Sequence, residues 1–114
     1  MINIAIIENN KIYRESLKTV LNQIDDFNVV YSSEGLTEGA ALPDEYKIDV
    51  MLMDYIIIRR GIKSFRDKKI ISISDFDELY AEENLQAKGI TAVIFKNSGK
   101  KEIENKIRKA YKNE

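Results

Sequence analysis

Polar residues follow each of the four most apolar stretches of the chain, and their types suit the handling of a phosphoryl group. These residues are Glu8 with Asn9, Asp54, Ser74 and Lys96. Carboxylate and amide oxygens are preferred ligands of Mg²⁺, a carboxylate can act as a nucleophile, and an ammonium group pairs with phosphate. A hydroxyl can donate a hydrogen bond to the same group. Any one of them alone would more often be a solvated loop residue, but the set predicts phosphoryl transfer onto Asp54.

The overall composition excludes several other kinds of chemistry. The chain has 114 residues with no cysteine and no histidine, which rules out disulfides, thiol nucleophiles, Cys/His zinc sites and histidine bases. Its net charge of -1 predicts no general attraction to nucleic acid or membrane. Its length fits a single domain, residues 1–114. Because no apolar run approaches the roughly 18 residues of a membrane span, we expect a cytoplasmic protein with no membrane partner.

Five short segments are expected to form strands. Four are almost continuously apolar and rich in β-branched residues, which is typical of strands buried on both faces; they cover residues 2–7, 48–53, 69–74 and 90–95. The more polar segment 27–32 suits a sheet edge. Since helical segments alternate with these strands, the sequence predicts an α/β fold of three layers with a parallel sheet. Ligands of such sheets bind at the carboxyl ends of the strands, where the polar residues named above would meet.

Two segments have the spacing of amphipathic helices. The helix expected over residues 10–24 can have Asn9 or Asn10 as its N-cap. One apolar face of this helix is expected to hold Ile12, Leu17, Val20, Leu21 and Ile24. In residues 100–112 the apolar positions recur every four residues, after a possible cap at Ser98; they are Ile103, Ile107 and Tyr111. Residues 77–89 predict a further helix, and 36–46 only a short one, because Gly39 and Pro43 weaken and stop it.

The whole chain resembles a response regulator receiver domain, the phosphoacceptor half of a two-component system. The resemblance rests on INIAIIENNKIYRESL for the first strand, acidic pair and first helix, IDVMLMD for the phosphoacceptor strand, IISIS for the hydroxyl-bearing strand and GITAVIFKNS for the strand with the lysine. The start most resembles the branch with a C-terminal helix-turn-helix domain. The resemblance implies a flavodoxin-like five-stranded sheet of order 2-1-3-4-5.

The resemblance also implies a role for each residue at the sheet edge. Asp54 would take a phosphoryl group from a histidine kinase, with Ser74 as the switch hydroxyl and Lys96 as the charge partner of the phosphate. The implied Mg²⁺ ligands are Glu8, Asn9, Asp54 and the backbone carbonyl of Ile56. Phosphorylation would alter the face formed by the family's fourth helix, fifth strand and fifth helix. That face would control the formation of a homodimer or the activity of a separate output domain. Only the output domain would contact DNA. Beyond its own aspartyl phosphorylation and dephosphorylation, the chain is not expected to be an enzyme.

Three features depart from the family pattern. Asn9 stands where the acidic pair usually ends in Asp, and the lost charge would weaken Mg²⁺ binding by on the order of a few kcal/mol. Residues 55–68 barely exceed the dozen residues that a crossover needs, so the third helix is expected to be shortened or missing. Val93 occupies the position of an aromatic residue whose rotamer reports phosphorylation in many members, while the nearby Phe95 is expected to pack in the core or against a helix.

These departures leave other functions open. The main alternative is a pseudo-receiver, which keeps the fold as an interaction or dimerisation module independent of phosphate. A flavin-binding protein on the same architecture is disfavoured, because ENNK after the first strand lacks the Ser, Thr and Gly of a phosphate-binding loop. Direct nucleic-acid binding by KKEIENKIRKAYK is also disfavoured, since acidic residues interrupt its positive charge and no aromatic residues are interleaved for stacking.

Overall fold

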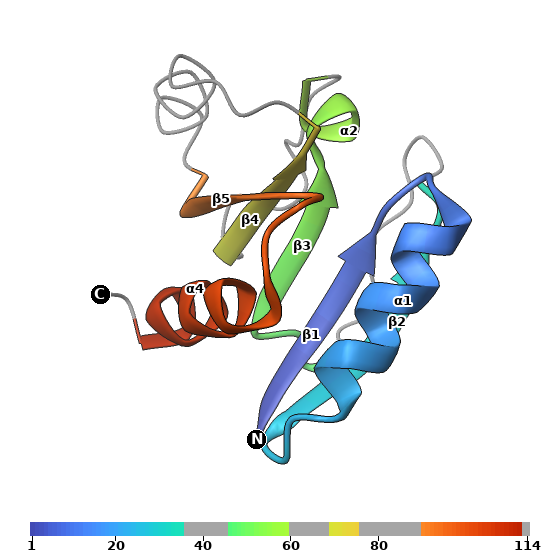
Figure 1. The fold of residues 1–114 in the computed structure, drawn as a ribbon. Coiled ribbons are helices and arrows are strands. Elements are labelled where there is room, and N and C mark those ends of the chain that lie inside the picture. The colour runs from blue at the N-terminus through green and yellow to red at the C-terminus, as the bar shows by residue number, and fades with distance from the viewer. Residues whose placement is uncertain (36–45, 60–68, 76–89, 113–114) are drawn as a thin grey trace.

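The computed structural model describes residues 1–35, 46–59, 69–75 and 90–112, which form a five-stranded parallel sheet with helices on its faces (Figure 1). The elements are β1 (Ile2–Ile7), α1 (Lys11–Asn22), β2 (Phe27–Ser33), β3 (Val50–Asp54), α2 (Tyr55–Arg59), β4 (Lys69–Ser74), β5 (Ala92–Phe95) and α4 (Lys100–Lys112). The strand order is β2-β1-β3-β4-β5. The expected strands, the parallel sheet and the flavodoxin-like order are therefore confirmed.

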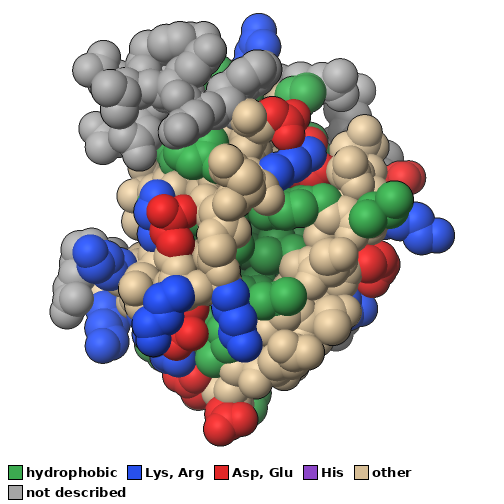
Figure 2. All heavy atoms as spheres, in the orientation of Figure 1, with side chains coloured by type: hydrophobic (Ala, Val, Ile, Leu, Met, Phe, Trp, Pro, Cys, Tyr) green, Lys and Arg blue, Asp and Glu red, His purple; other side chains and the backbone are tan. Residues whose placement is uncertain are grey.

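The two faces of the sheet carry separate apolar clusters. On one face, α1 and α4 both cover the sheet and bury Leu17, Leu21, Ile103 and Ile107 against alternate strand residues (Figure 1). Hydrophobic side chains are visible between the two helices (Figure 2). On the other face, Ile58 of α2 packs with the strand residues that alternate with those of the first cluster. Successive strand side chains point to opposite faces, so β1, β3 and β4 need apolar residues at nearly every position. This requirement explains their unbroken hydrophobic runs.

The N-terminus of α1 is fixed by Asn10 and not by Asn9. The side-chain oxygen of Asn10 accepts the backbone N–H of Tyr13 at 3.0 Å, which satisfies one of the free donors of the first helical turn. The expected buried position of Ile12 is wrong, because its side chain is 81% exposed. Ile12 lies nine residues, or two and a half helical turns, before Leu21, which places it on the opposite side of α1. Tyr13 instead packs against the cluster of Leu17 and Leu21.

The sequence also assigned two residues near α4 incorrectly. Ser98 does not cap the helix: its hydroxyl accepts the N–H of Phe95, and the carbonyl of Gly99 accepts the first helical bond, from Ile103. Tyr111 is 41% exposed, and the last buried position of the helix is Ala110. Phe95, expected in the core, is partly buried and packs on the cluster that contains Ile58.

Three predicted features lie wholly or largely outside the described residues. The segments 36–45 and 76–89, which contain most of the expected short helix and all of the helix at 77–89, are not described. Within 55–68, the structure describes only the five-residue helix α2, directly after β3. None of the helices in the described ranges combines the length and apolar character needed to cross a bilayer.

Candidate functional site

The polar residues singled out from the sequence come together at the carboxyl edge of the sheet. Ile7 of β1 pairs with Met53 of β3, which brings the following residues of the two strands to the same level. Across the other side of β3, Asp54 pairs with Ile73 of β4. The next pairing, of Ser74 with Phe95, completes the edge with β5. Glu8, Asp54, Ser74 and Lys96 therefore follow or end four adjacent strands at one edge.

Glu8 and Lys96 form a direct ion pair at this edge. The Lys96 Nζ lies 3.3 Å from Glu8 Oε2, and the Glu8 side chain is fully buried while that of Lys96 is 25% exposed. The same Glu8 oxygen accepts the N–H of Asn10 at 2.7 Å. The Arg14 guanidinium donates to the Glu8 backbone carbonyl, also at 2.7 Å. Backbone and side chain of Glu8 are thus both anchored to the start of α1.

Lys96 has a second acidic partner and an aromatic neighbour. Its ammonium lies 3.4 Å from Asp75 Oδ1 and 5.5 Å from the centre of the Tyr13 ring. Partial burial alone would lower the pKa of Lys96, but the carboxylates of Glu8 and Asp75 outweigh it, so the pKa is raised. Lys96 therefore stays fully charged at neutral pH. Burial, with the negative charges of Glu8 and Asp75, also raises the pKa of Tyr13 to about 12.

Asp54 is 8% exposed and caps the short helix that follows it. Its Oδ1 accepts the backbone N–H of Ile56 at 3.1 Å. Among the described residues, Asp54 forms no ion pair, because the ammonium of Lys96 is directed to Glu8 and Asp75. The structure therefore brings Asp54 to the same edge as Lys96 without a salt bridge between them. Ile56, whose carbonyl was a candidate metal ligand, has a side chain that is 52% exposed.

Ser74 is held by a residue that the sequence analysis did not select. Its hydroxyl lies 3.2 Å from the hydroxyl of Ser72, and the two side chains are 2% and 0% exposed. The Ser74 carbonyl accepts the backbone N–H of Lys96 at 3.1 Å, which joins the ends of β4 and β5. Within IISIS the two serines are two positions apart, and strand alternation places them on one face. That spacing was the available signal for Ser72.

The donor atoms at this edge can be tested against a divalent cation. Glu8 Oε1 is buried and has no hydrogen-bond partner in the described part of the chain, although an unsatisfied buried carboxylate oxygen is costly. Such an oxygen is a suitable ligand for a hard cation. Asn9, the next candidate ligand, is exposed. Within the described residues no three acidic side chains gather as a metal cluster, so further protein ligands would be the amide of Asn9 and backbone carbonyls.

Two other residues at this edge were missed by sequence reasoning. Asp75, which pairs with Lys96, is the first residue after β4 and could have been found by extending the search one residue beyond each strand. Tyr13 gave no signal, since an aromatic residue in a first helical turn is ordinary. Its hydroxyl is buried with no hydrogen-bond partner among the residues that the structure describes, an observation that only the structure can supply.

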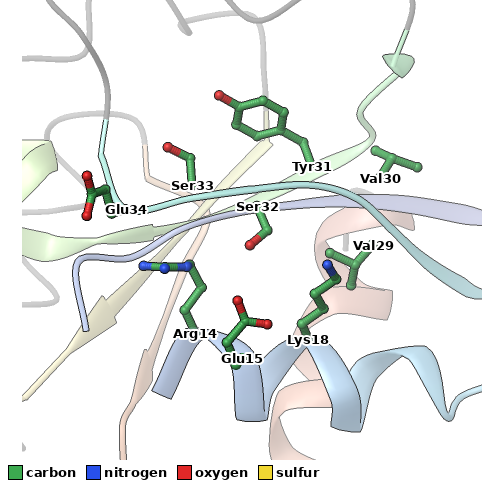
Figure 3. A pocket seen from close by; sticks show the side chains of 9 residues that line it. All are labelled: Arg14, Glu15, Lys18, Val29, Val30, Tyr31, Ser32, Ser33 and Glu34. Atoms are coloured by element: carbon green, nitrogen blue, oxygen red, sulfur yellow. The ribbon is translucent and has the colours of Figure 1, made fainter. Parts of the chain in front are cut away.

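A separate polar cleft of about 410 Å³ lies between α1 and the edge strand β2 (Figure 3). It is lined by Arg14, Glu15 and Lys18 of α1, by residues 29–33 of β2 and by Glu34. Figure 3 shows the side chains of Glu15, Lys18 and Ser32 directed into the space between helix and strand. The lining carries charges of both signs and includes none of the residues at the sheet edge, so the cleft is distinct from the candidate site.

Comparisons with known proteins agree with this geometry. No family model matches the chain. The oxygen regulatory protein NreC of Staphylococcus aureus strain JH9 is 28% identical over 120 residues, covering 97% of this chain and 55% of NreC. The signal receiver domain of the response regulator NarL from Mycobacterium tuberculosis has a TM-score of 0.83 at 19% identity, covering 99% of this chain and 98% of that domain. The chain has the receiver-domain fold.

Another receiver-containing protein gives the same match. A two-component response regulator of the LuxR family from an Aurantimonas species has a TM-score of 0.82 at 18% identity, covering 97% of this chain and 85% of that one. The resemblance to receiver domains noted from the sequence is thus confirmed, and the homologues are response regulators. The chain spans about half the length of the curated relatives, of which it covers 55%.

Proposed function

We propose that the chain is a phosphoacceptor receiver domain of a two-component system and that Asp54 accepts the phosphoryl group from a histidine kinase. The observation that carries the proposal is the assembly at the sheet edge, where the buried Glu8 and Asp54 stand beside Ser74 and the charged Lys96. In the transfer, an oxygen of Asp54 forms a bond to phosphorus while the bond between phosphorus and the kinase imidazole breaks. A carboxylate needs no base to act as nucleophile, which suits a chain without histidine.

Each residue around Asp54 has a role in this proposal. The ammonium of Lys96 and the hydroxyl of Ser74 contact the phosphoryl oxygens and offset their charge. Mg²⁺, when bound, neutralises charge on the transferring group, and Glu8, Asn9, Asp54 and the carbonyl of Ile56 would hold it. The unpartnered Glu8 Oε1 supports this set. Asn9 contributes an uncharged oxygen, so binding is weaker than with two acids at positions 8 and 9.

The proposed partners follow from the comparisons. The P1 domain of CheA3 has been solved in complex with CheY6 from R. sphaeroides, and that structure matches this chain with a TM-score of 0.73 at 20% identity. A histidine-bearing kinase domain is the corresponding partner proposed here. The response would spread through β5 and α4, the family's fifth strand and fifth helix, to a second copy of the chain or to an output domain that binds DNA. Residues 77–89, at the family's fourth helix, lie outside the described ranges.

A pseudo-receiver is the second candidate, and four observations favour it. Val93 is buried in β5 where a movable aromatic residue is usual, and Asn9 reduces the charge available to a metal. Lys96 is already neutralised by Glu8 and Asp75, and Asp54 serves as the cap of α2. In this case the fold would act as an interaction or dimerisation module without phosphate. Both candidates place the chain in signalling and not in metabolic catalysis.

Phosphorylation with a small donor separates the two candidates. The chain is incubated with acetyl phosphate and millimolar Mg²⁺, and its intact mass is measured. We expect one added phosphoryl group, which disappears in Asp54→Asn and when Mg²⁺ is removed by a chelator. Asp25→Asn, an exposed acid before β2 at the opposite edge, is the matched control and should still be phosphorylated. An unchanged mass in the folded wild-type chain would leave the pseudo-receiver as the function.

A further inference from the structure

The hydroxyl pair of Ser72 and Ser74 is a buried polar contact that the proposed chemistry does not use. The two oxygens are 3.2 Å apart, and neither side chain is more than 2% exposed. Residues two apart on a strand have Cα atoms separated by roughly 6.6 Å, at about 3.3 Å per residue. The two hydroxyls must therefore lean toward one another, and that of Ser74 leans back from the strand end into the sheet.

This position directs the Ser74 hydroxyl away from Asp54. Ser72 pairs with Met53 on one side and with Val93 on the other, on the sheet face that holds the cluster of Ile58. Asp54 pairs with Ile73, which belongs to the opposite cluster. Since paired residues of parallel strands share a face and neighbours alternate, the two serines and Asp54 start on opposite faces. To reach a group on Asp54, the Ser74 hydroxyl must rotate around the end of β4.

The backbone of Ser74 limits that movement to its side chain. Its carbonyl is held by the N–H of Lys96, so the end of β4 stays joined to β5 while the hydroxyl turns. When it turns, the Ser72 hydroxyl is left fully buried with no partner among the described residues. An unsatisfied buried hydroxyl is unfavourable, so the contact opposes the rotation.

We propose that Ser72 is a positioning residue that latches Ser74 in a resting orientation and thereby weakens binding of a phosphoryl group at Asp54. This inference rests on the proposed function. Removing the Ser72 hydroxyl acts in two ways: the resting Ser74 hydroxyl loses its buried partner, and the rotated state no longer leaves Ser72 unpaired. Both effects favour the rotated state. If Ser72 instead passed a hydrogen bond through Ser74 to the phosphoryl group, its removal would weaken binding.

The test measures binding of beryllofluoride, a non-transferable phosphoryl analogue, by calorimetry in saturating Mg²⁺. We expect Ser72→Ala to tighten binding about tenfold, which corresponds to about 1.4 kcal/mol. Ser72→Thr keeps the hydroxyl and should bind close to wild type, which guards against an effect of packing. The affinity for Mg²⁺ alone should be unchanged in Ser72→Ala, whereas a general distortion of the site would alter it.

A second comparison, made in the Ser74→Ala variant, makes the test specific to the contact between Ser72 and Ser74. In Ser74→Ala there is no hydroxyl to hold, so adding Ser72→Ala should leave beryllofluoride affinity unchanged. Equal or weaker binding by folded Ser72→Ala, or the same gain in both backgrounds, would overturn the latch while leaving phosphorylation at Asp54 intact. If neither wild type nor any folded variant binds beryllofluoride, the proposed function fails and the latch fails with it. Binding by Ser72→Ala alone would support a latch strong enough to close the site.

Discussion

The ion pair between Glu8 and Lys96 gives the most direct stability test of the site. Replacing Lys96 by Met keeps a long apolar side chain but removes the only cation within 4 Å of the Glu8 carboxylate among the described residues. Breaking a deeply buried ion pair costs about 3–5 kcal/mol, and breaking an exposed one costs about 0–1 kcal/mol. Glu8 is fully buried, but Lys96 is 25% exposed and the contact of 3.3 Å is long for a charge-assisted bond. We therefore expect Lys96→Met to lower the free energy of unfolding by about 2 kcal/mol.

Urea unfolding at neutral pH measures this loss, and a double-mutant cycle assigns it to the pair. Glu8→Gln removes the acidic partner, and the double variant should lose less than the two single losses together. Lys100→Met, at the exposed start of α4, is the matched control and should stay within about 0.5 kcal/mol of wild type. A loss for Lys96→Met no larger than that of the control, or full additivity in the cycle, would refute the argued magnitude.

The pH dependence of the same loss has a defined sign. The pKa of Lys96 is raised in the folded state above its ordinary value of 10.5 by the carboxylates of Glu8 and Asp75, against the opposing effect of burial. Its contribution is therefore fully present below the unfolded pKa and is lost as pH rises through the folded pKa. The stability difference between wild type and Lys96→Met should be constant from neutral pH to about pH 9 and shrink in strong alkali. A difference that grows in alkali would contradict the assignment.

Three further predictions concern the surroundings of the site. Asn10→Ala should cost about 1 kcal/mol of stability through the lost cap, whereas Asn9→Ala should cost little stability and weaken Mg²⁺ binding, as calorimetry can check. An ultraviolet titration should show a phenol that ionises at about pH 12, and Tyr13→Phe should remove that step. Because the pKa of Tyr13 is raised in the folded state, alkali destabilises the fold, since the phenol ionises first in the unfolded chain. Leu21→Ala should cost about 2–5 kcal/mol in urea unfolding, and Ile12→Ala less than about 0.5 kcal/mol.

The sheet was predictable because its strands must be apolar on both sides. Unbroken runs such as INIAII exist only where neighbouring strands and covering helices exclude water from both faces, and the observed β1 matches its predicted range. The parallel arrangement then followed from the alternation of strands and helices, and the position of the site from the strand ends. Ile12 was misplaced because it lies on the opposite side of the helix from Leu21, whereas Tyr13 lies on the buried face.

The contacts within the site could not be predicted in the same way. Glu8 and Lys96 are 88 positions apart, and their pairing depends on strand order, register and the first turn of α1 together. The resemblance to receiver domains predicted that Lys96 lies at this edge of the sheet and pairs with a phosphate. In the structure, Lys96 lies at that edge and pairs with Glu8 and Asp75. Ser72 was overlooked because its only signal in the sequence was its two-residue spacing from Ser74, which by itself indicates no chemistry.

The charge balance at the sheet edge shows how a site with one acid fewer can still attract a divalent cation. Asn9 removes a negative charge from the expected acidic pair, but Asp75 adds one that the family comparison did not include. Lys96 can neutralise only one of the carboxylates of Glu8, Asp54 and Asp75, so the cluster keeps a net negative charge at neutral pH. Because Lys96 contacts only one oxygen of Glu8, the other stays available to a cation. Asp75→Asn should therefore weaken Mg²⁺ binding measured by calorimetry, and an unchanged affinity would show that Asp75 serves only to hold Lys96.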